Sequence, residues 1–215
     1  MSTSPNIPAI PPASTITPPA PTLPTVTTDI VRKMFPVTPL AHIIANLPPV
    51  LNALTAANLA DKQMVLMALA TIRAETESFV PCAEGQSKYN TSPGGAAFCL
   101  YDNRHDLGNQ GPPDGATFRG RGFIQLTGRA NYTRYAADLG LDLVTNPSLA
   151  CDPATAARLL AHFLATRQAA IRHALSNGDL ASARRLVNGG THGLDRFTAA
   201  YRAGSQLLAH IPALA

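Results

Sequence analysis

The stretch from Asp61 to Ser78 constrains the fold of this chain more than any other part of its 215 residues. Its apolar side chains recur at three- and four-residue intervals, the spacing that places them on one face of an α-helix. They are Met64, Val65, Ala68, Leu69 and Ile72. Asp61 stands where a capping or first-turn acid belongs. The sequence therefore predicts a strong helix here, with a buried stripe that leads toward Glu75.

Helical patterns continue on both sides of this segment. Before it, short helices are expected at 31–35 and 39–47, because Pro36 and the pair Pro48-Pro49 each end a preceding helix. After it, capping acids and glycines mark further helices. These are expected at 128–139, 153–176, 179–186 and 196–210.

The segment from 80 to 122 lacks such periodicity. It is dense in Gly, Pro, Asn and Asp and too long for an ordinary connection, which indicates a functional loop region. No run of alternating β-branched residues indicates a sheet, and a small hairpin at 118–126 is the most that we expect. The predicted fold is therefore mainly α, with one long irregular region.

The first 28 residues differ in composition from the rest. They are almost wholly Pro, Ser, Thr, Ala and isolated aliphatics, with eight prolines. Such a segment is typical of a disordered tail, and the alternative is a docking segment for a delivery partner. The start also lacks a basic stretch followed by an apolar run, so we expect no secretory signal peptide. We therefore divide the chain into a tail, 1–28, and one globular domain, 29–215.

Composition narrows the classes of partner. Apolar residues make up 46% of the chain, which suffices for a core. The net charge is +4 and the isoelectric point is near 9.2, which suits an anionic partner. No cluster of Lys and Arg with interleaved aromatics favours nucleic acid, so nucleic-acid binding is not expected. No apolar run reaches the 18 residues or so of a membrane-spanning helix.

The three cysteines, Cys82, Cys99 and Cys151, allow at most one disulfide within the chain. None lies in a pattern with metal-ligand spacing. Cys82 and Cys99 bracket one loop-rich stretch, so either they pair or all three remain free thiols.

The chain has only three glutamates, Glu75, Glu77 and Glu84. Glu75 falls at the edge of the buried stripe, where desolvation favours the protonated form that a proton donor needs. Glu77 is rotated by about 200° on helical geometry and is expected to face solvent. The alternative is that both are ordinary last-turn acids, although negative charge there opposes the helix dipole.

A second group of polar residues occupies 101–109, 114–115 and 118–132. Its glycines alternate with side chains that donate in forks or amide pairs, which suits recognition of hydroxyl and acetamido groups. A phosphate-binding loop is excluded, because the third glycine of GxGxxG and the lysine of a P-loop are missing. For Arg119 and Arg129 taken singly, a tight basic turn is the alternative.

The segment Phe118-Arg-Gly-Arg-Gly-Phe-Ile-Gln-Leu-Thr-Gly-Arg-Ala-Asn-Tyr132 resembles the signature of glycoside hydrolase family 19, the chitinases and related phage and bacterial endolysins. Three further segments agree in order. They are Ala74-Glu-Thr-Glu-Ser-Phe79, Tyr101 to Asn109 with Asp114-Gly115, and Val187-Asn-Gly-Gly190. The resemblance spans roughly residues 60 to 200, nearly a whole domain, and implies a lysozyme-like α-helical fold.

The resemblance implies two catalytic carboxylates and an inverting mechanism. Glu75 matches the family's general acid, although Ala74 replaces the usual histidine before it. For the base that activates water, Asp102 is the candidate, since it aligns with a glutamate of endolysin-like members. Asp106 and Glu84 are the alternatives.

Further site residues follow from the same resemblance. Thr127 stands where the family holds the water, and Arg196 lies where the family carries an arginine that orders the acids. Tyr132 would offer an aromatic platform beside the sugar. The remaining sugar-binding positions are Gln125, Asn131 and Asn188.

The implied activity is hydrolysis of β-1,4 bonds in peptidoglycan, and the alternatives are a chitinase and a catalytically silent module that binds amino-sugar polymers. No metal or cofactor is implied, because two carboxylates and a water complete the chemistry. We expect a monomer with a polysaccharide substrate, and a delivery partner or an immunity protein as its protein partners. We also expect synthesis in the cytoplasm and action on the cell wall, after delivery by a phage-type pore or a secretion machine.

Overall fold

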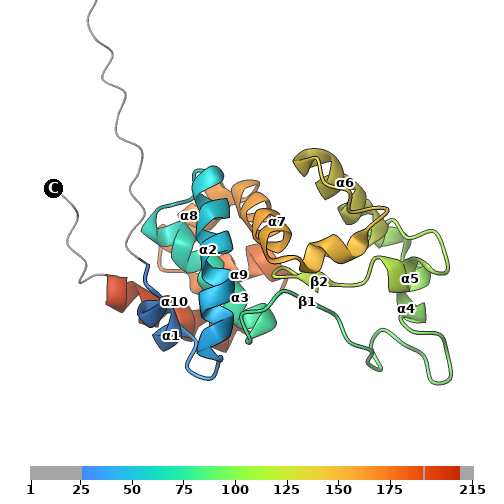
Figure 1. Cartoon of the computed structure of the whole chain (residues 1–215), viewed down its shortest axis with the longest axis horizontal. Coiled ribbons are helices and arrows are strands. Elements are labelled where there is room, and N and C mark those ends of the chain that lie inside the picture. Colours follow the sequence, from blue (N-terminus) through green and yellow to red (C-terminus); the bar gives the residue numbers. More distant parts are fainter. Residues whose placement is uncertain (1–25, 191, 209–215) are drawn as a thin grey trace, which may run out of the picture.

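The computed structural model of the chain describes residues 26–190 and 192–208. Figure 1 shows two groups of helices on either side of a small sheet. We call the larger group the helical lobe; it comprises α1 (Thr28–Met34), α2 (Leu40–Ala56), α3 (Lys62–Thr76), α7 (Pro153–Ala165), α8 (Gln168–Ser176), α9 (Leu180–Asn188) and α10 (Leu194–Leu208). The smaller group, the loop lobe, comprises α4 (Cys99–Asp102), η1 (His105–Leu107), α5 (Asp114–Thr117) and α6 (Arg129–Leu139). The prediction of a mainly α fold is confirmed.

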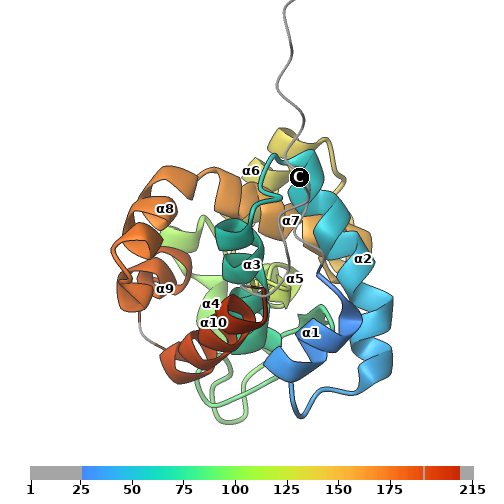
Figure 2. The same ribbon diagram turned by 90° about the vertical axis from the view of Figure 1, so that its left-hand side faces the viewer.

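Helix α3 lies at the centre of the helical lobe, with α8 and α9 on one side and α2 on the other (Figure 2). Asp61 caps it by accepting hydrogen bonds from the backbone N–H groups of Gln63 and Met64, at 3.1 and 3.2 Å. Every side chain from Met64 to Ile72 is buried. The predicted apolar stripe therefore belongs to a helix that is buried on all sides.

Helix α2 continues through Pro48 and Pro49, contrary to the prediction that it ends before them. The prolines leave the carbonyl groups of Ile44 and Ala45 without amide partners, but both residues are exposed, so water takes the place of the missing donors. The apolar positions on the other face remain in register and buried. They include Ile43, Leu47, Val50 and Leu54.

The single helix predicted at 153–176 is in fact two helices, α7 and α8, and the prediction was wrong there. At the break, the Arg167 guanidinium donates to the Phe163 carbonyl at 3.4 Å and to the Thr166 hydroxyl at 2.9 Å. The Thr166 hydroxyl also donates to the Phe163 carbonyl. These side chains take over acceptors that a continuing helix would use, so the chain turns without proline or glycine.

A two-stranded antiparallel sheet connects the lobes. Strand β1 (Cys82–Ala83) pairs with β2 (Arg121–Gly122), with Cys82 opposite Gly122. The hairpin predicted at 118–126 is reduced to one bridge between Arg121 and Leu126, and the strand partner of β2 lies 39 residues earlier. A β-carbon on Gly122, whose φ is +80°, would stand 2.6 Å from the Ala150 carbonyl of the short helix η2 (Pro147–Cys151), so only glycine fits there.

The expected tail, 1–28, lies outside the described residues except for its last three positions. Thr27 caps α1, which begins at Thr28, and Val26 packs against the core. The predicted last helix runs to Leu208, and its expected end at His210 also lies outside the described part. In the described ranges, no helix is both long and apolar enough to cross a membrane.

Candidate active site

Glu75 lies in the last turn of α3, with its side chain 16% exposed. Its Oε1 atom is 2.8 Å from Nη2 of Arg184, a residue of α9 that is fully buried. A buried guanidinium next to a carboxylate fixes the orientation of the carboxylate and stabilises its negative charge. The sequence reasoning missed Arg184, because nothing in the pair Arg184-Arg185 shows which of the two side chains faces the core.

Arg184 is held in place from the other side by the backbone after α9. Its Nε and Nη2 atoms donate to the His192 carbonyl at 3.0 and 2.8 Å. The Asn188 side chain donates to the same carbonyl at 3.1 Å. Asn188, expected to bind sugar, therefore shapes the turn that positions Arg184, and its side chain remains exposed.

Arg196 lies near the end of α3 but contacts a different carboxylate from the one expected. It donates to the Ala74 carbonyl at 3.4 Å and forms an ion pair with Glu77 at 3.6 Å. Glu77 is 51% exposed, as predicted, and also pairs with Arg73 at 2.7 Å. Arg73 first, and then Arg196, hold the pKa of Glu77 below its ordinary value. The arginine that contacts Glu75 is thus Arg184, whereas Arg196 supports the helix end.

Glu84 follows β1 directly and is partly exposed. Its Oε1 atom accepts hydrogen bonds from the Asn90 amide and the Tyr101 hydroxyl, both at 2.9 Å, and its Oε2 atom accepts from the Gly120 N–H at 3.3 Å. Burial and the carboxylate of Glu84 together raise the pKa of Tyr101 to about 12. Three donors from separate segments therefore hold the Glu84 carboxylate in one orientation.

Two polar side chains converge with Glu84 around Gly120. A β-carbon on Gly120 would lie 2.9 Å from Oε1 of Gln125, 3.2 Å from Oε2 of Glu84 and 3.3 Å from Oγ1 of Thr127. The absence of a side chain at Gly120 thus lets a carboxylate, an amide and a hydroxyl approach one another. Such a group suits the positioning of a water molecule or a sugar hydroxyl.

The two aspartates considered as bases are placed differently. Asp102 is only 7% exposed, and its Oδ1 atom accepts from the Gly115 N–H at 2.8 Å, which joins α4 to α5. Asp106 is exposed and forms an ion pair with Arg104 at 2.6 Å, which lowers the pKa of Asp106. Of the three acids named as possible bases, Glu84 is the one that is both accessible and grouped with Gln125 and Thr127.

Phe79 connects the two glutamates, which are nine positions apart in the chain. Its buried ring packs edge-on against Phe35 of the helical lobe, with ring centroids 4.7 Å apart. On its other side it packs against Phe123, directly after β2, at 6.2 Å. The segment between Glu75 and Glu84 is therefore fixed in the core at its midpoint.

The comparisons with known proteins concern the fold that carries these residues. No protein-family model matches the chain. A glycosyl hydrolase family 19 domain-containing protein of Haemophilus influenzae is 41% identical over 56 residues, which cover 26% of this chain and 28% of that protein. The match thus spans little more than a quarter of the curated relative's length.

Solved structures match over most of the chain. Chitinase C from Streptomyces griseus HUT6037 superposes with a TM-score of 0.55 at 20% identity, covering 86% of this chain and 76% of that one. A bacterial family 19 chitinase superposes with a TM-score of 0.61 at 24% identity, covering 88% of this chain and 98% of that one. The fold is that of a family 19 chitinase. The predicted resemblance to glycoside hydrolase family 19 is therefore confirmed, together with the lysozyme-like fold.

Within this family 19 fold, the other expected site residues divide into two groups. Gln125, Thr127 and Asn131 line one pocket of about 210 Å³. The Tyr132 ring, in contrast, is fully buried, and its hydroxyl donates to the Arg119 carbonyl at 2.9 Å and accepts from the Arg121 guanidinium at 3.0 Å. Tyr132 therefore has no free aromatic face to offer a sugar, and it supports the segment that carries Gly120.

The cysteines follow the free-thiol alternative. Cys82, Cys99 and Cys151 are all unbridged. Cys99 is engaged locally, where its Sγ atom lies 3.1 Å from the Ser92 hydroxyl. The loop lobe is therefore held together without a disulfide.

Proposed function

We propose that this chain is a glycoside hydrolase that cleaves β-1,4 bonds in peptidoglycan, with Glu75 as proton donor and Glu84, rather than Asp102, as the base. The family 19 fold supports the reaction class. The observation that carries the proposal is the pair of glutamates at the junction of the lobes, each held by its own set of donors. An inverting hydrolase needs two such carboxylates, about 6.5 to 9.5 Å apart, with a water between the base and the sugar.

The roles follow from what holds each carboxylate. Glu75 gives its proton to the oxygen of the leaving sugar, and Arg184 stabilises the negative charge that remains on Glu75. Glu84 takes a proton from the attacking water, which Gln125 and Thr127 help to orient near Gly120. Asp102 is less suited to this step, because it is buried between α4 and α5, whereas Glu84 is partly exposed.

The two carboxylates are tested by replacing each acid with its amide and measuring the release of reducing ends from purified cell walls. We expect Glu75→Gln and Glu84→Gln to lower kcat by about 10² to 10⁴-fold. Asp102→Asn should lower the melting temperature but leave kcat within a few-fold of the wild type, and Glu77→Gln serves as the exposed control. If Asp102→Asn abolishes hydrolysis in a folded protein while Glu84→Gln remains active, the base is Asp102.

Arg184 is tested as a positioning residue with two variants. Arg184→Met should lower kcat by about 10²-fold with little change in KM, because the acid loses its orientation but the sugar contacts remain. Arg184→Lys keeps a positive charge and should restore part of kcat. Arg184→Met should also lower the free energy of unfolding by about 3 kcal/mol, and adding Glu75→Gln should recover part of that loss by removing the uncompensated carboxylate. Equal loss of kcat in both Arg184 variants would contradict the positioning role.

A chitinase is the second candidate, favoured by the two chitinases that share the fold. The net charge of +4 favours the anionic cell wall over uncharged chitin. A turbidity assay on cell walls, run beside a digest of N-acetylglucosamine oligomers, separates the two. Cleavage of chitin oligomers alone would exclude peptidoglycan as the substrate. Binding of either polymer without cleavage would favour the third alternative, a sugar-binding module without activity.

A further inference from the structure

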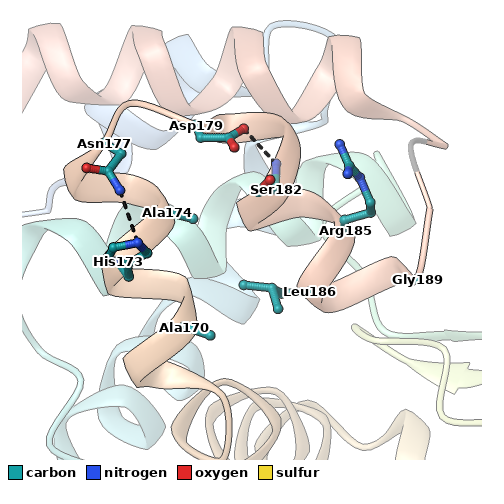
Figure 3. A pocket seen from close by; sticks show the side chains of 9 residues that line it. All are labelled: Ala170, His173, Ala174, Asn177, Asp179, Ser182, Arg185, Leu186 and Gly189. Atoms are coloured by element: carbon teal, nitrogen blue, oxygen red, sulfur yellow. Dashed lines mark hydrogen bonds between the residues drawn. The ribbon is translucent and has the colours of Figure 1, made fainter.

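A pocket of about 520 Å³ lies between α8 and α9 in the helical lobe (Figure 3). Its apolar lining includes Ala170, Ala174 and Leu186. The polar side chains around it are His173, Asn177, Asp179, Ser182 and Arg185. The pocket thus combines a small apolar surface with several hydrogen-bonding groups, as sites for small polar ligands do.

The pocket holds one carboxylate, Asp179, and one guanidinium, Arg185; hydrogen bonds from Ser182 first, and the charge of Arg185 in addition, lower the pKa of Asp179. Asp179 is engaged as the cap of α9, where its Oδ1 atom accepts from the Ser182 N–H at 2.9 Å, the contact dashed in Figure 3. His173 and Asn177 contact each other at 3.3 Å. Arg185 is exposed, and its guanidinium makes no hydrogen bond or ion pair with any residue in the described ranges. Arg185 is therefore the cation of this pocket that can pair with a ligand.

The pocket and the proposed acid are connected through α9. Arg184 turns inward to Glu75, and the next residue, Arg185, lines the pocket, about 100° farther round the helix. Gly189, at the end of α9, lines the pocket as well. The whole of α9 is about 13 Å long. A short peptide branch, which extends by about 3.3 to 3.6 Å per residue, can therefore run along α9 from a polymer held at Glu75 to the pocket.

We infer that the pocket between α8 and α9 binds the peptide branch of peptidoglycan through the carboxylate at its end, an inference that rests on the proposed hydrolysis of that polymer. The Arg185 guanidinium pairs with the carboxylate, since planar guanidinium groups match carboxylates in two-point contacts. Asn177 and Ser182 bond the peptide groups, and Ala174 and Leu186 contact small side chains such as the methyl group of alanine. Chitin carries neither peptide nor charge, so this pocket selects peptidoglycan.

The test measures binding to the full-length Glu75→Gln variant, which leaves the ligand intact. The probes are soluble glycan fragments that carry their peptides and the same fragments from which an amidase has removed them. We expect Arg185→Gln, added to Glu75→Gln, to weaken binding of the peptide-bearing fragments by about tenfold and binding of the stripped fragments not at all. Arg202→Gln, an exposed arginine of α10, is the matched control and should change neither.

Hydrolysis by the otherwise wild-type chain separates this inference from the proposed function. If the chain cleaves both kinds of fragment and Arg185→Gln changes neither binding nor kcat/KM, the pocket does not bind the peptide and the glycosidase stands. If nothing is cleaved but peptide-bearing fragments bind through Arg185, the result supports peptide binding in the pocket and contradicts the proposed hydrolysis. Equal affinity of the wild-type pocket for fragments with and without peptides would also overturn the inference.

Discussion

The two lobes are stabilised by different kinds of contact. In the helical lobe, the side chains around α3 are apolar and buried, with Leu69 among the residues that have no exposed surface. In the loop lobe, a smaller apolar cluster forms beside α6 and includes Tyr132 and Tyr135, whereas the groups buried around α4 and α5 are largely polar. Asp102 accepts from the Gly115 N–H, and Asp114 forms an ion pair with Arg129 at the start of α6. Glu75 lies in the apolar surroundings of α3, and Glu84 lies at the edge of the polar surroundings of α4 and α5.

This difference shows which kind of contact holds each of the two glutamates. Apolar packing tolerates no unpaired charge, and Arg184, a charged group buried beside α3, is accordingly paired with Glu75. Around α4 and α5, directional hydrogen bonds hold short segments that contribute few apolar side chains. Glu84, the candidate base, is thus held by directional hydrogen bonds from the polar segments around it.

The largest effect is expected from the apolar side of the comparison. Leu69→Ala leaves a cavity in the middle of α3 and should lower the free energy of unfolding by about 3 kcal/mol in urea titrations. Leu100→Ala, in the loop lobe, removes a side chain that is 46% exposed and should cost less than about 0.5 kcal/mol. Similar losses for the two variants would show that the lobes do not differ in this way.

A smaller effect is expected where α4 approaches α5. A β-carbon on Gly115 would lie 2.2 Å from the Phe98 carbonyl and 2.9 Å from Oδ1 of Asp102, so Gly115→Ala should lower the free energy of unfolding by about 2 kcal/mol. The opening should be local, with hydrogen exchange increasing at 98–117 before α3 is affected. Gly85→Ala is the control, because nothing lies within 4 Å of its β-carbon. Uniform exchange across both lobes would contradict this expectation.

The smallest effect depends on pH. The ion pair with Arg129 first, and a hydrogen bond from the Gln110 N–H second, hold the pKa of Asp114 below its ordinary value. Stability from this group is therefore fully present above the ordinary aspartate pKa of about 4 and is lost as the pH falls through the lowered value. Asp114→Asn should lower the free energy of unfolding by about 1.5 kcal/mol at pH 7, and the difference should shrink below about pH 4.

The control for this prediction is the other partner of the pair. Arg129→Gln removes the same interaction, so its urea-unfolding profile between pH 3 and 7 should change in the same direction. A constant difference between the wild type and Asp114→Asn over that range would show that the ion pair does not stabilise the loop lobe.

Local signals predicted much of the helical lobe. The helix at α3, its cap at Asp61 and the solvent-facing side chain of Glu77 all follow from spacing along one segment. The predicted ends of two helices were wrong. The spacing of apolar residues does not show where hydrogen bonds or solvent let a helix stop or continue. Helix α2 continues through its prolines because its freed carbonyl groups face water, and α7 ends because Thr166 and Arg167 take its last acceptors.

The site was less predictable, because its contacts join distant segments. Glu84 meets Tyr101 and Gly120, which lie 17 and 36 positions away, and neither spacing has a period that a sequence pattern reveals. The pair of Glu75 and Arg184 spans 109 positions, and only packing decides that Arg184 faces inward and Arg185 outward. The resemblance favours Asp102 as the base, but a resemblance in sequence does not report how deeply a side chain is buried, and the structure shows Asp102 to be 7% exposed.

The position of Phe79 has a consequence for how firmly the two glutamates are placed. Its ring contacts Phe35 on one side and Phe123 on the other, and all three rings belong to the core of the helical lobe. The segment that joins Glu75 to Glu84 is therefore anchored by edge-to-face aromatic contacts, which salt and pH barely alter. Changes in ionic strength should therefore leave the placement of Glu75 relative to Glu84 unchanged.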